Sequence, residues 1–192
     1  GNVLSLGSFS KIMAPGLRLG WIQAAPHLME RLLDSGAVNS GGSFNQFTSM
    51  VMREAIERGL QTAFLQRLRQ AYASRVETMD AALREHLGGR ARWLRPGGGY
   101  FFWLELDQGV DTTALRARAQ DFEIGFQPGA NFSPRGELRN CLRLSFAFYG
   151  EDDIREGVAR LGRLLDACEL PVVVNSEPAS AGAPYSVLSR PA

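Results

Sequence analysis

Apolar residues recur at helical spacing along two stretches of the chain. Between Gln61 and His86 they step by three or four residues, which predicts a long amphipathic helix. This stripe consists of Leu65, Leu68, Tyr72, Val76, Met79 and Leu83. A second stripe predicts a final helix that begins with the acidic run 151–153, because carboxylates favour the positive end of a helix dipole. It consists of Ile154, Val158, Leu161 and Leu165.

Shorter segments alternate between strand-like and helix-like composition. Five β-prone runs predict strands, of which the first is expected to be buried: Val3–Leu6, Leu17–Gln23, Tyr100–Leu106, Ile124–Gln127 and Cys141–Phe146. Three further segments predict helices: Pro26–Asp34, Phe44–Arg58 before Gly59, and Thr112–Gln120. Because strands and helices mix along the chain, the fold class is α/β or α+β.

The long helix predicted from Gln61 divides the chain. Residues 1–60 hold a strand–loop–strand piece that cannot close a hydrophobic core alone, whereas residues 61–170 hold a compact set of strands and helices. The composition changes near Asn175, after which Pro, Ser, Ala and Gly dominate without an apolar period. We therefore predict a disordered or loosely docked tail over residues 171–192.

Composition and charge exclude several classes of protein. With 192 residues, 45% apolar and 21% charged, the chain is neither collagenous, coiled-coil nor disordered as a whole. A net charge of +1 gives no electrostatic case for a nucleic-acid surface or an anionic membrane, and no apolar run is long enough to span a bilayer. The two cysteines, Cys141 and Cys168, are too few for a disulfide framework or a metal cluster. We therefore expect a cytoplasmic, reducing environment.

The segment richest in chemistry runs from Gly7 to Trp21. Lys11 lies in a Ser/Gly turn after a predicted strand, and Arg18 follows seven residues later. The hydroxyls of Ser8 and Ser10 together with the guanidinium could hold a phosphate, and a nearby cation favours the neutral, nucleophilic form of a partly desolvated lysine. The alternative is a surface lysine in a Ser-rich loop and an ordinary ion pair of Arg18.

The motif Ser-Phe-Ser-Lys over residues 8–11, followed by Ala-Pro-Gly-Leu-Arg-Leu-Gly-Trp over residues 14–21, closely resembles the Schiff-base lysine motif of class I/II aminotransferases. These are fold-type I enzymes that use pyridoxal 5′-phosphate, and the nearest subgroup resembles the 2-aminoadipate and kynurenine aminotransferases. Further segments resemble the same subgroup: Ser40–Ser43, Arg67–Arg75, Pro96–Leu104, Gln127–Phe132 and Leu142–Ala147. The resemblance covers about residues 1–168.

The resemblance implies a role for each matching residue. Lys11 would bind the cofactor aldehyde and later move a proton at the substrate Cα; Ser8, Ser10 and Arg18 would bind the cofactor phosphate. Arg143 would hold the substrate α-carboxylate, although an arginine capping an edge strand is the plain alternative. The implied reaction transfers an amino group from an L-amino acid to a 2-oxo acid, and the implied assembly is a homodimer. Tyr100 and Phe101 could line the substrate pocket, although core packing is the commoner duty of such aromatic runs.

The resemblance also implies that the chain is the C-terminal portion of the fold-type I transferase fold. Residues 1–60 would be the end of the large cofactor-binding domain, and residues 61–170 the interdomain helix with a small α+β domain. Family members contact the pyridine nitrogen and ring with Asp, Tyr and an aromatic residue that precede the lysine. The ten residues before Lys11 include no Asp, Tyr, His or Trp. We therefore expect the chain alone to be inactive or nearly so.

Three other functions remain open from the sequence. MocR-type transcription regulators carry a similar aminotransferase-like domain behind a DNA-binding helix-turn-helix, so nucleic acid would be a partner only in that case. Lyases and decarboxylases on the same fold share Lys11 and Arg18, and a truncated product without activity is the last alternative. The residues present do not identify the amino-acid substrate.

Overall fold

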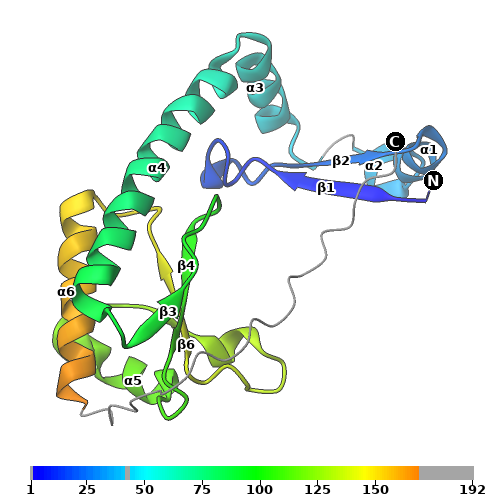
Figure 1. Ribbon diagram of the computed structural model, residues 1–192. Coiled ribbons are helices and arrows are strands. Elements are labelled where there is room, and N and C mark those ends of the chain that lie inside the picture. The colour runs from blue at the N-terminus through cyan, green and yellow to red at the C-terminus, as the bar shows by residue number, and fades with distance from the viewer. Residues whose placement is uncertain (1, 42–43, 169–192) are drawn as a thin grey trace, which may run out of the picture. The chain divides into compact units, whose positions relative to one another are not determined.

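The computed structural model describes residues 2–41 and 44–168 (Figure 1). Gly42 and Ser43 of the predicted Ser/Gly turn lie outside the described residues, as does the predicted tail over residues 171–192. The chain divides into two compact units, Gly1–Thr78 and Met79–Ala192. The division falls inside one long helix, and the predicted domain boundary between residues 60 and 61 stays a prediction.

The first unit contains a two-stranded ribbon and a series of helices. Strand β1 (Leu4–Ser8) pairs antiparallel with β2 (Gly20–Ala24), and a short 3₁₀ helix, η1 (Pro15–Leu17), lies in the loop between them. Helices follow in chain order: α1 (Pro26–Leu33), α2 (Gly36–Asn39), α3 (Gln46–Glu57) and the start of α4 (Leu60–Leu87). Proline begins α1, where its missing N–H costs no hydrogen bond.

Two expectations for the first unit are wrong. The first strand was expected to be buried, yet Val3 and Leu6 are 74% and 75% exposed, because β1 pairs only with β2 among the described residues. The second strand was expected from Leu17, but it starts at Gly20. The 3₁₀ turn and the left-handed backbone of Arg18, with φ 48°, keep the preceding residues out of the ladder.

The predicted helix 44–58 is confirmed as α3, whereas α2 was not predicted.

The ribbon depends on a glycine beneath an indole ring. Gly7 lies opposite Trp21 in the register, and a Cβ at Gly7 would lie 2.0 Å from the indole Cε2. We therefore expect Gly7→Ala to displace the ring and to lower the free energy of unfolding by about 1–3 kcal/mol, measured by urea titration. Gly16→Ala in the same loop is the matched control, because nothing lies within 4 Å of its added Cβ. Equal stability of the two variants would contradict this packing.

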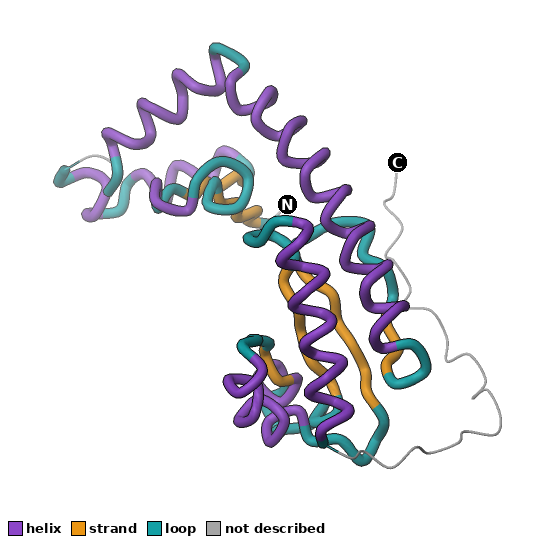
Figure 2. Tube along the Cα trace, turned by 90° about the vertical axis from the view of Figure 1, so that its left-hand side faces the viewer, coloured by secondary structure: helices purple, strands orange, loops and turns teal. Residues whose placement is uncertain are grey.

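The second unit is an antiparallel sheet covered by helices. Its strand order is β3-β4-β6-β5, formed by β3 (Ala91–Trp93), β4 (Phe101–Leu106), β5 (Gln127–Pro128) and β6 (Cys141–Ser145). Figures 1 and 2 show α6 (Glu151–Ala167) and the C-terminal end of α4 on the same face of this sheet. Helix α5 (Thr112–Arg118) continues into the 3₁₀ helix η2 (Ala119–Phe122), and η3 (Gly129–Phe132) follows β5.

The core of this unit follows the periods read from the sequence. Alternate residues of β4 are buried, and Phe102 packs edge-to-face on Phe146 with ring centroids 6.0 Å apart. All four residues of the predicted α6 stripe are buried, and in α4 the stripe residues Val76, Met79 and Leu83 are buried as well. The predicted long helix and the predicted final helix are therefore confirmed. The inward face is confirmed for α6 and for the C-terminal part of α4, whereas Leu65, Leu68 and Tyr72 are only half-buried.

One predicted strand in this unit is largely wrong. Of the run Ile124–Gln127, only Gln127 belongs to a strand, β5. The backbone N–H of Ile124 instead donates to the carbonyl of Ala119 (3.1 Å), and Glu123 adopts a left-handed conformation with φ 52°. These contacts close the 3₁₀ turn that follows α5. The three-residue strand β3 was not predicted, because three residues are too few to display a period.

A buried hydroxyl joins α5 to the chain before β6. The side chain of Thr112 is fully buried, and its Oγ1 lies 2.8 Å from the carbonyl oxygen of Arg139 and 2.7 Å from that of Cys141. We expect Thr112→Val to lower the free energy of unfolding by about 1–3 kcal/mol, because buried carbonyls lose their donor. The exposed neighbour Thr113→Val is the control in the same helix. Thermal unfolding checks both variants, and an unchanged Thr112→Val would contradict the prediction.

Candidate active site

The predicted cofactor-binding residues lie in the first unit, at the last residue of β1 and on the loop between β1 and β2. The carbonyl oxygen of Phe9 accepts hydrogen bonds from the backbone N–H groups of Ile12 (3.3 Å), Met13 (2.9 Å) and Ala14 (3.2 Å). The N–H of Phe9 in turn donates to the carbonyl of Leu19 at 3.0 Å. This network folds the loop back onto the ribbon and fixes the backbone that carries Ser8, Ser10 and Lys11.

Ser8, Ser10 and Lys11 occupy the first turn of this loop. The backbone N–H of Ser10 donates to the hydroxyl oxygen of Ser8 at 3.2 Å, which keeps the two serines close together. Lys11 is exposed, so the described residues do not supply the partial desolvation that the sequence suggested. Its side chain nevertheless has an interaction within the chain.

Arg18 lies at the C-terminal end of this loop, and hydrogen bonds fix the backbone around it. Its guanidinium Nη1 donates to the carbonyl of Pro15 at 3.4 Å. The side-chain amide of Asn45, the N-cap residue of α3, donates to the carbonyls of Leu17 (3.0 Å) and Arg18 (3.3 Å). Asn45 thus stabilises a left-handed backbone that a non-glycine residue rarely adopts. Sequence reasoning missed Asn45, whose only signal is a position just before a helix.

The donor set of this loop fits pyridoxal phosphate. A primary amine, two hydroxyls and a guanidinium, which has five N–H donors, are the groups that a phosphate and an aldehyde require. Only one hydrogen bond is made by the Arg18 side chain within the described residues. Its remaining N–H groups are therefore available to an anion.

Arg143 belongs to the second unit, in the middle of β6. It pairs across the sheet with Trp103 of β4 and with Gln127 of β5. Its guanidinium carbon lies 3.8 Å from the ring centroid of Phe101 and 4.4 Å from that of Phe132. Phe101 lies on the face of β4 opposite the core, because it is 40% exposed whereas the adjacent Phe102 is fully buried. Tyr100 precedes β4 and is half-buried.

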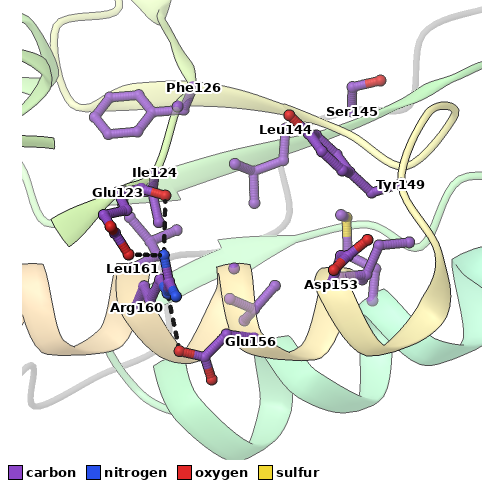
Figure 3. A pocket seen from close by; sticks show the side chains of 15 residues that line it. Glu123, Ile124, Phe126, Leu144, Ser145, Tyr149, Asp153, Glu156, Arg160 and Leu161 are labelled. Atoms are coloured by element: carbon purple, nitrogen blue, oxygen red, sulfur yellow. Dashed lines mark hydrogen bonds and ion pairs between the residues drawn. The ribbon is translucent and has the colours of Figure 1, made fainter. Parts of the chain in front are cut away.

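A cavity of about 320 Å³ opens in the second unit beside α6 (Figure 3). Its walls include the apolar side chains of Phe126 and Leu144, and Arg160 on its edge bonds Glu123 (2.6 Å) and Glu156 (2.9 Å). Hydrogen bonds from Arg160 and from Arg163 hold the pKa of Glu156 below its usual range. The five predicted site residues do not line this cavity.

The part of the chain that the structure describes offers neither a metal site nor a membrane-spanning helix. No group of three or more His, Cys, Asp and Glu side chains there could hold a metal ion. No helix there is both long and apolar enough to cross a membrane.

Burial raises the pKa of the Cys141 thiol, and a nearby carboxylate, Glu105, adds to this effect. Cys141 is therefore a buried, protonated thiol.

Comparisons with known proteins give the same family along most of the chain. The family model described as "Aminotransferase class I and II" matches residues 1–161. The chain is 37% identical to the 2-aminoadipate transaminase of Thermus thermophilus over 85% of its own length and 41% of that protein. It superimposes on the kynurenine aminotransferase of Pyrococcus horikoshii with a TM-score of 0.79 and 30% identity, covering 88% of this chain and 42% of that one.

A different kind of relative shares the same region. The chain is 32% identical to the uncharacterised HTH-type transcriptional regulator YdfD of Bacillus subtilis, over 86% of this chain and 34% of the regulator. The chain spans about two fifths of the length of the curated aminotransferases it matches. Because the family model extends over residues 1–161, from the Lys11 loop through most of α6, the chain belongs to the class I and II aminotransferase family.

Proposed function

We propose that the protein containing this chain is a pyridoxal-phosphate-dependent aminotransferase. The observation that carries the proposal is the segment Ser8–Arg18, which contributes an amine, two hydroxyls and a guanidinium from one short stretch of chain inside the region that the family model matches. The reaction moves an amino group from an L-amino acid to a 2-oxo acid. The likeness to enzymes named for 2-aminoadipate and kynurenine supports the same subgroup for this protein.

Different residues of the loop would contact different groups of the cofactor. When bound, pyridoxal phosphate withdraws electrons from the substrate Cα and carries the amino group between substrates. Ser8 and Ser10 would donate hydroxyl hydrogen bonds to the phosphate, and Arg18 would add a charge-assisted pair. Lys11 would hold the aldehyde through its ε-amine. The same amine, when free, would take the proton from the substrate Cα as a general base.

Arg143 would bind the substrate α-carboxylate. Its planar fork of N–H donors matches the two oxygens of a carboxylate, which orients the amino acid as well as attracting it. A lysine at this position would supply the charge without the fork.

The organisation of the chain follows from the same proposal. Residues 1–60 would form the end of the large cofactor-binding domain, and residues 61–170 the interdomain helix and the small domain. The chain would thus be the C-terminal portion of a fold-type I transferase, with the complete protein a cytoplasmic homodimer. The exposed apolar face of β1 supports this proposal, because Leu4 and Leu6, which share that face, are both exposed among the described residues.

The experiment measures amino-group transfer by the longer protein and by the 192-residue chain. With pyridoxal phosphate, the longer protein is expected to convert 2-aminoadipate and a 2-oxo acid into the exchanged pair. The chain alone is expected to be inactive or nearly so, because ring contacts to the cofactor come from outside it. Full activity of the chain alone would overturn its assignment as a part. No transfer by the longer protein from any amino acid would overturn the aminotransferase proposal.

A second candidate function is the effector domain of a MocR-type transcription regulator. The similarity to an HTH-type regulator over 86% of this chain supports it. In that case the same loop binds the cofactor, but the output is binding to DNA. A gel-shift experiment with the upstream DNA of the gene separates the two candidates. Cofactor-dependent DNA binding without turnover would favour the regulator.

A further inference from the structure

The backbone of Arg143 is fixed on both sides. Strand β6 lies between β4 and β5, so that Arg143 has Trp103 opposite it on one side and Gln127 on the other. The position of its Cα is therefore determined by two ladders. The guanidinium lies at the end of a long, flexible side chain, and ordering such a side chain costs rotamer freedom. Some other contact must hold it if it is to bind a ligand in one orientation.

Two phenyl rings supply that contact. The Cζ of Arg143 lies over the ring of Phe101 at 3.8 Å and over the ring of Phe132 at 4.4 Å, well within the ~6 Å reach of a cation–π interaction. A ring stacked on a guanidinium contacts its flat face. The N–H groups lie in the plane of the guanidinium, so stacking fixes the plane and leaves its edge open.

Among the residues that the structure describes, no acidic side chain competes for this guanidinium. Within residues 2–41 and 44–168, Arg143 forms no ion pair and donates no side-chain hydrogen bond. Its neighbours in the same unit differ: Arg139 pairs with Asp111, and Arg160 pairs with Glu123 at 2.6 Å. A half-buried arginine that is stacked but has no counter-charge is suited to a carboxylate from outside the chain.

Phe132 is itself held in place. Its ring packs edge-to-face on Trp103, with centroids 5.5 Å apart and planes at 77°. It ends the 3₁₀ helix that starts at Gly129, where an added Cβ would lie 2.3 Å from the carbonyl oxygen of Leu138 and 2.7 Å from the Cβ of Cys141. The turn therefore lies directly against the chain that enters β6, and this contact sets the distance from Phe132 to Arg143.

We propose that Phe101 and Phe132 are positioning residues, which clamp the guanidinium of Arg143 by stacking so that its in-plane N–H groups face the α-carboxylate of the substrate. The proposal rests on the proposed function and adds to it two residues with an indirect role. Neither ring needs to touch the reacting atoms. Their effect is on the orientation, and hence on the affinity, of the carboxylate-binding group.

The test compares two amino donors on the holoenzyme: an L-amino acid and the amine of the same side chain that lacks the α-carboxylate. The measured quantity is the ratio of their kcat/KM values. Phe132→Leu is expected to lower this ratio about fivefold to tenfold, because only the amino acid uses the clamp. Phe101→Leu is expected to act in the same direction. Phe132→Tyr keeps the ring and is expected to keep the ratio.

Two comparisons separate positioning from a general structural effect. Phe148→Leu removes a ring that is 82% exposed after β6, and it is expected to leave the ratio unchanged. In an Arg143→Leu background, Phe132→Leu is expected to lower the ratio no further. An unchanged ratio in Phe132→Leu, or an equal loss for both donors, would overturn the proposal.

A direct binding measurement keeps this proposal distinct from the proposed function. If the wild-type protein transfers an amino group from neither donor, the proposed function fails, and calorimetric titration with glutarate then decides the role of the rings. Weaker binding by both Phe132→Leu and Arg143→Leu would support the stacked clamp without turnover. Equal affinity of the wild-type protein and both variants would overturn it.

Discussion

Replacing Lys11 with alanine is expected to lower amino-group transfer by about 10⁴-fold or more, because the proposed function makes one amine both the cofactor anchor and the general base. Lys11→Arg is expected to be equally inactive. It keeps the positive charge, but a guanidinium does not lose its proton in a protein and cannot accept one from a Cα. Loss of activity in both variants, at unchanged thermal stability, would assign the defect to the amine rather than to the charge or the fold.

The sequence allows a direct test of the predicted bond between Lys11 and the cofactor aldehyde. Lys11 is the only lysine among the 192 residues, so within this chain it is the only side-chain amine that can bond to an aldehyde. Borohydride reduction of the holoenzyme followed by peptide mass analysis is expected to place the cofactor on the peptide that contains Lys11. In Lys11→Ala no peptide of this chain is expected to carry it.

A separate variant distinguishes anchoring from phosphate binding. Arg18→Leu is expected to weaken cofactor retention while leaving the reducible bond on Lys11 once cofactor is in excess, because the amine remains. A cofactor trapped on another segment of the longer protein, with normal activity in Lys11→Ala, would contradict the assignment of Lys11.

Features set by short-range periodicity could be predicted from the sequence. The stripes of α4 and α6 repeat over several turns, so residues such as Val76 and Leu161 identify a buried face without knowledge of what covers it. The sites of Ser8, Ser10 and Lys11 on one turn also follow from adjacency in the chain. Such features depend on neighbours within about ten residues, and these are present in the sequence.

Features set by distant contacts could not be predicted. The left-handed backbone of Arg18 depends on Asn45, which lies 27 residues away. The exposure of β1 is another example, because an apolar strand predicts burial only where a second layer exists to cover it. The stacking of Phe132 on Arg143 joins a 3₁₀ turn to a strand and leaves no pattern in either segment. In each case the missing information is tertiary.

Arg143 gives the second large effect. Arg143→Leu is expected to lower kcat/KM for an amino acid by about 10²-fold to 10³-fold, because under the proposed function the substrate carboxylate would lose its charge-assisted partner in a partly buried site. Arg143→Lys is expected to recover only a small part of this loss. An ammonium restores the charge but neither the planar fork nor the stacking on Phe101 and Phe132.

The direction of the change in each kinetic constant tests the role of Arg143 further. If an interaction is equally strong in the bound substrate and in the transition state, its loss raises KM and leaves kcat unchanged. If its loss also misplaces the Cα proton relative to the base, kcat falls as well. We expect both changes for Arg143→Leu, because the fork binds the carboxylate and orients the Cα. Arg116→Leu, an exposed arginine of α5, is the matched control and is expected to change neither constant. Normal kcat and KM in Arg143→Leu would show that Arg143 only supports the aromatic cluster on this face of the sheet.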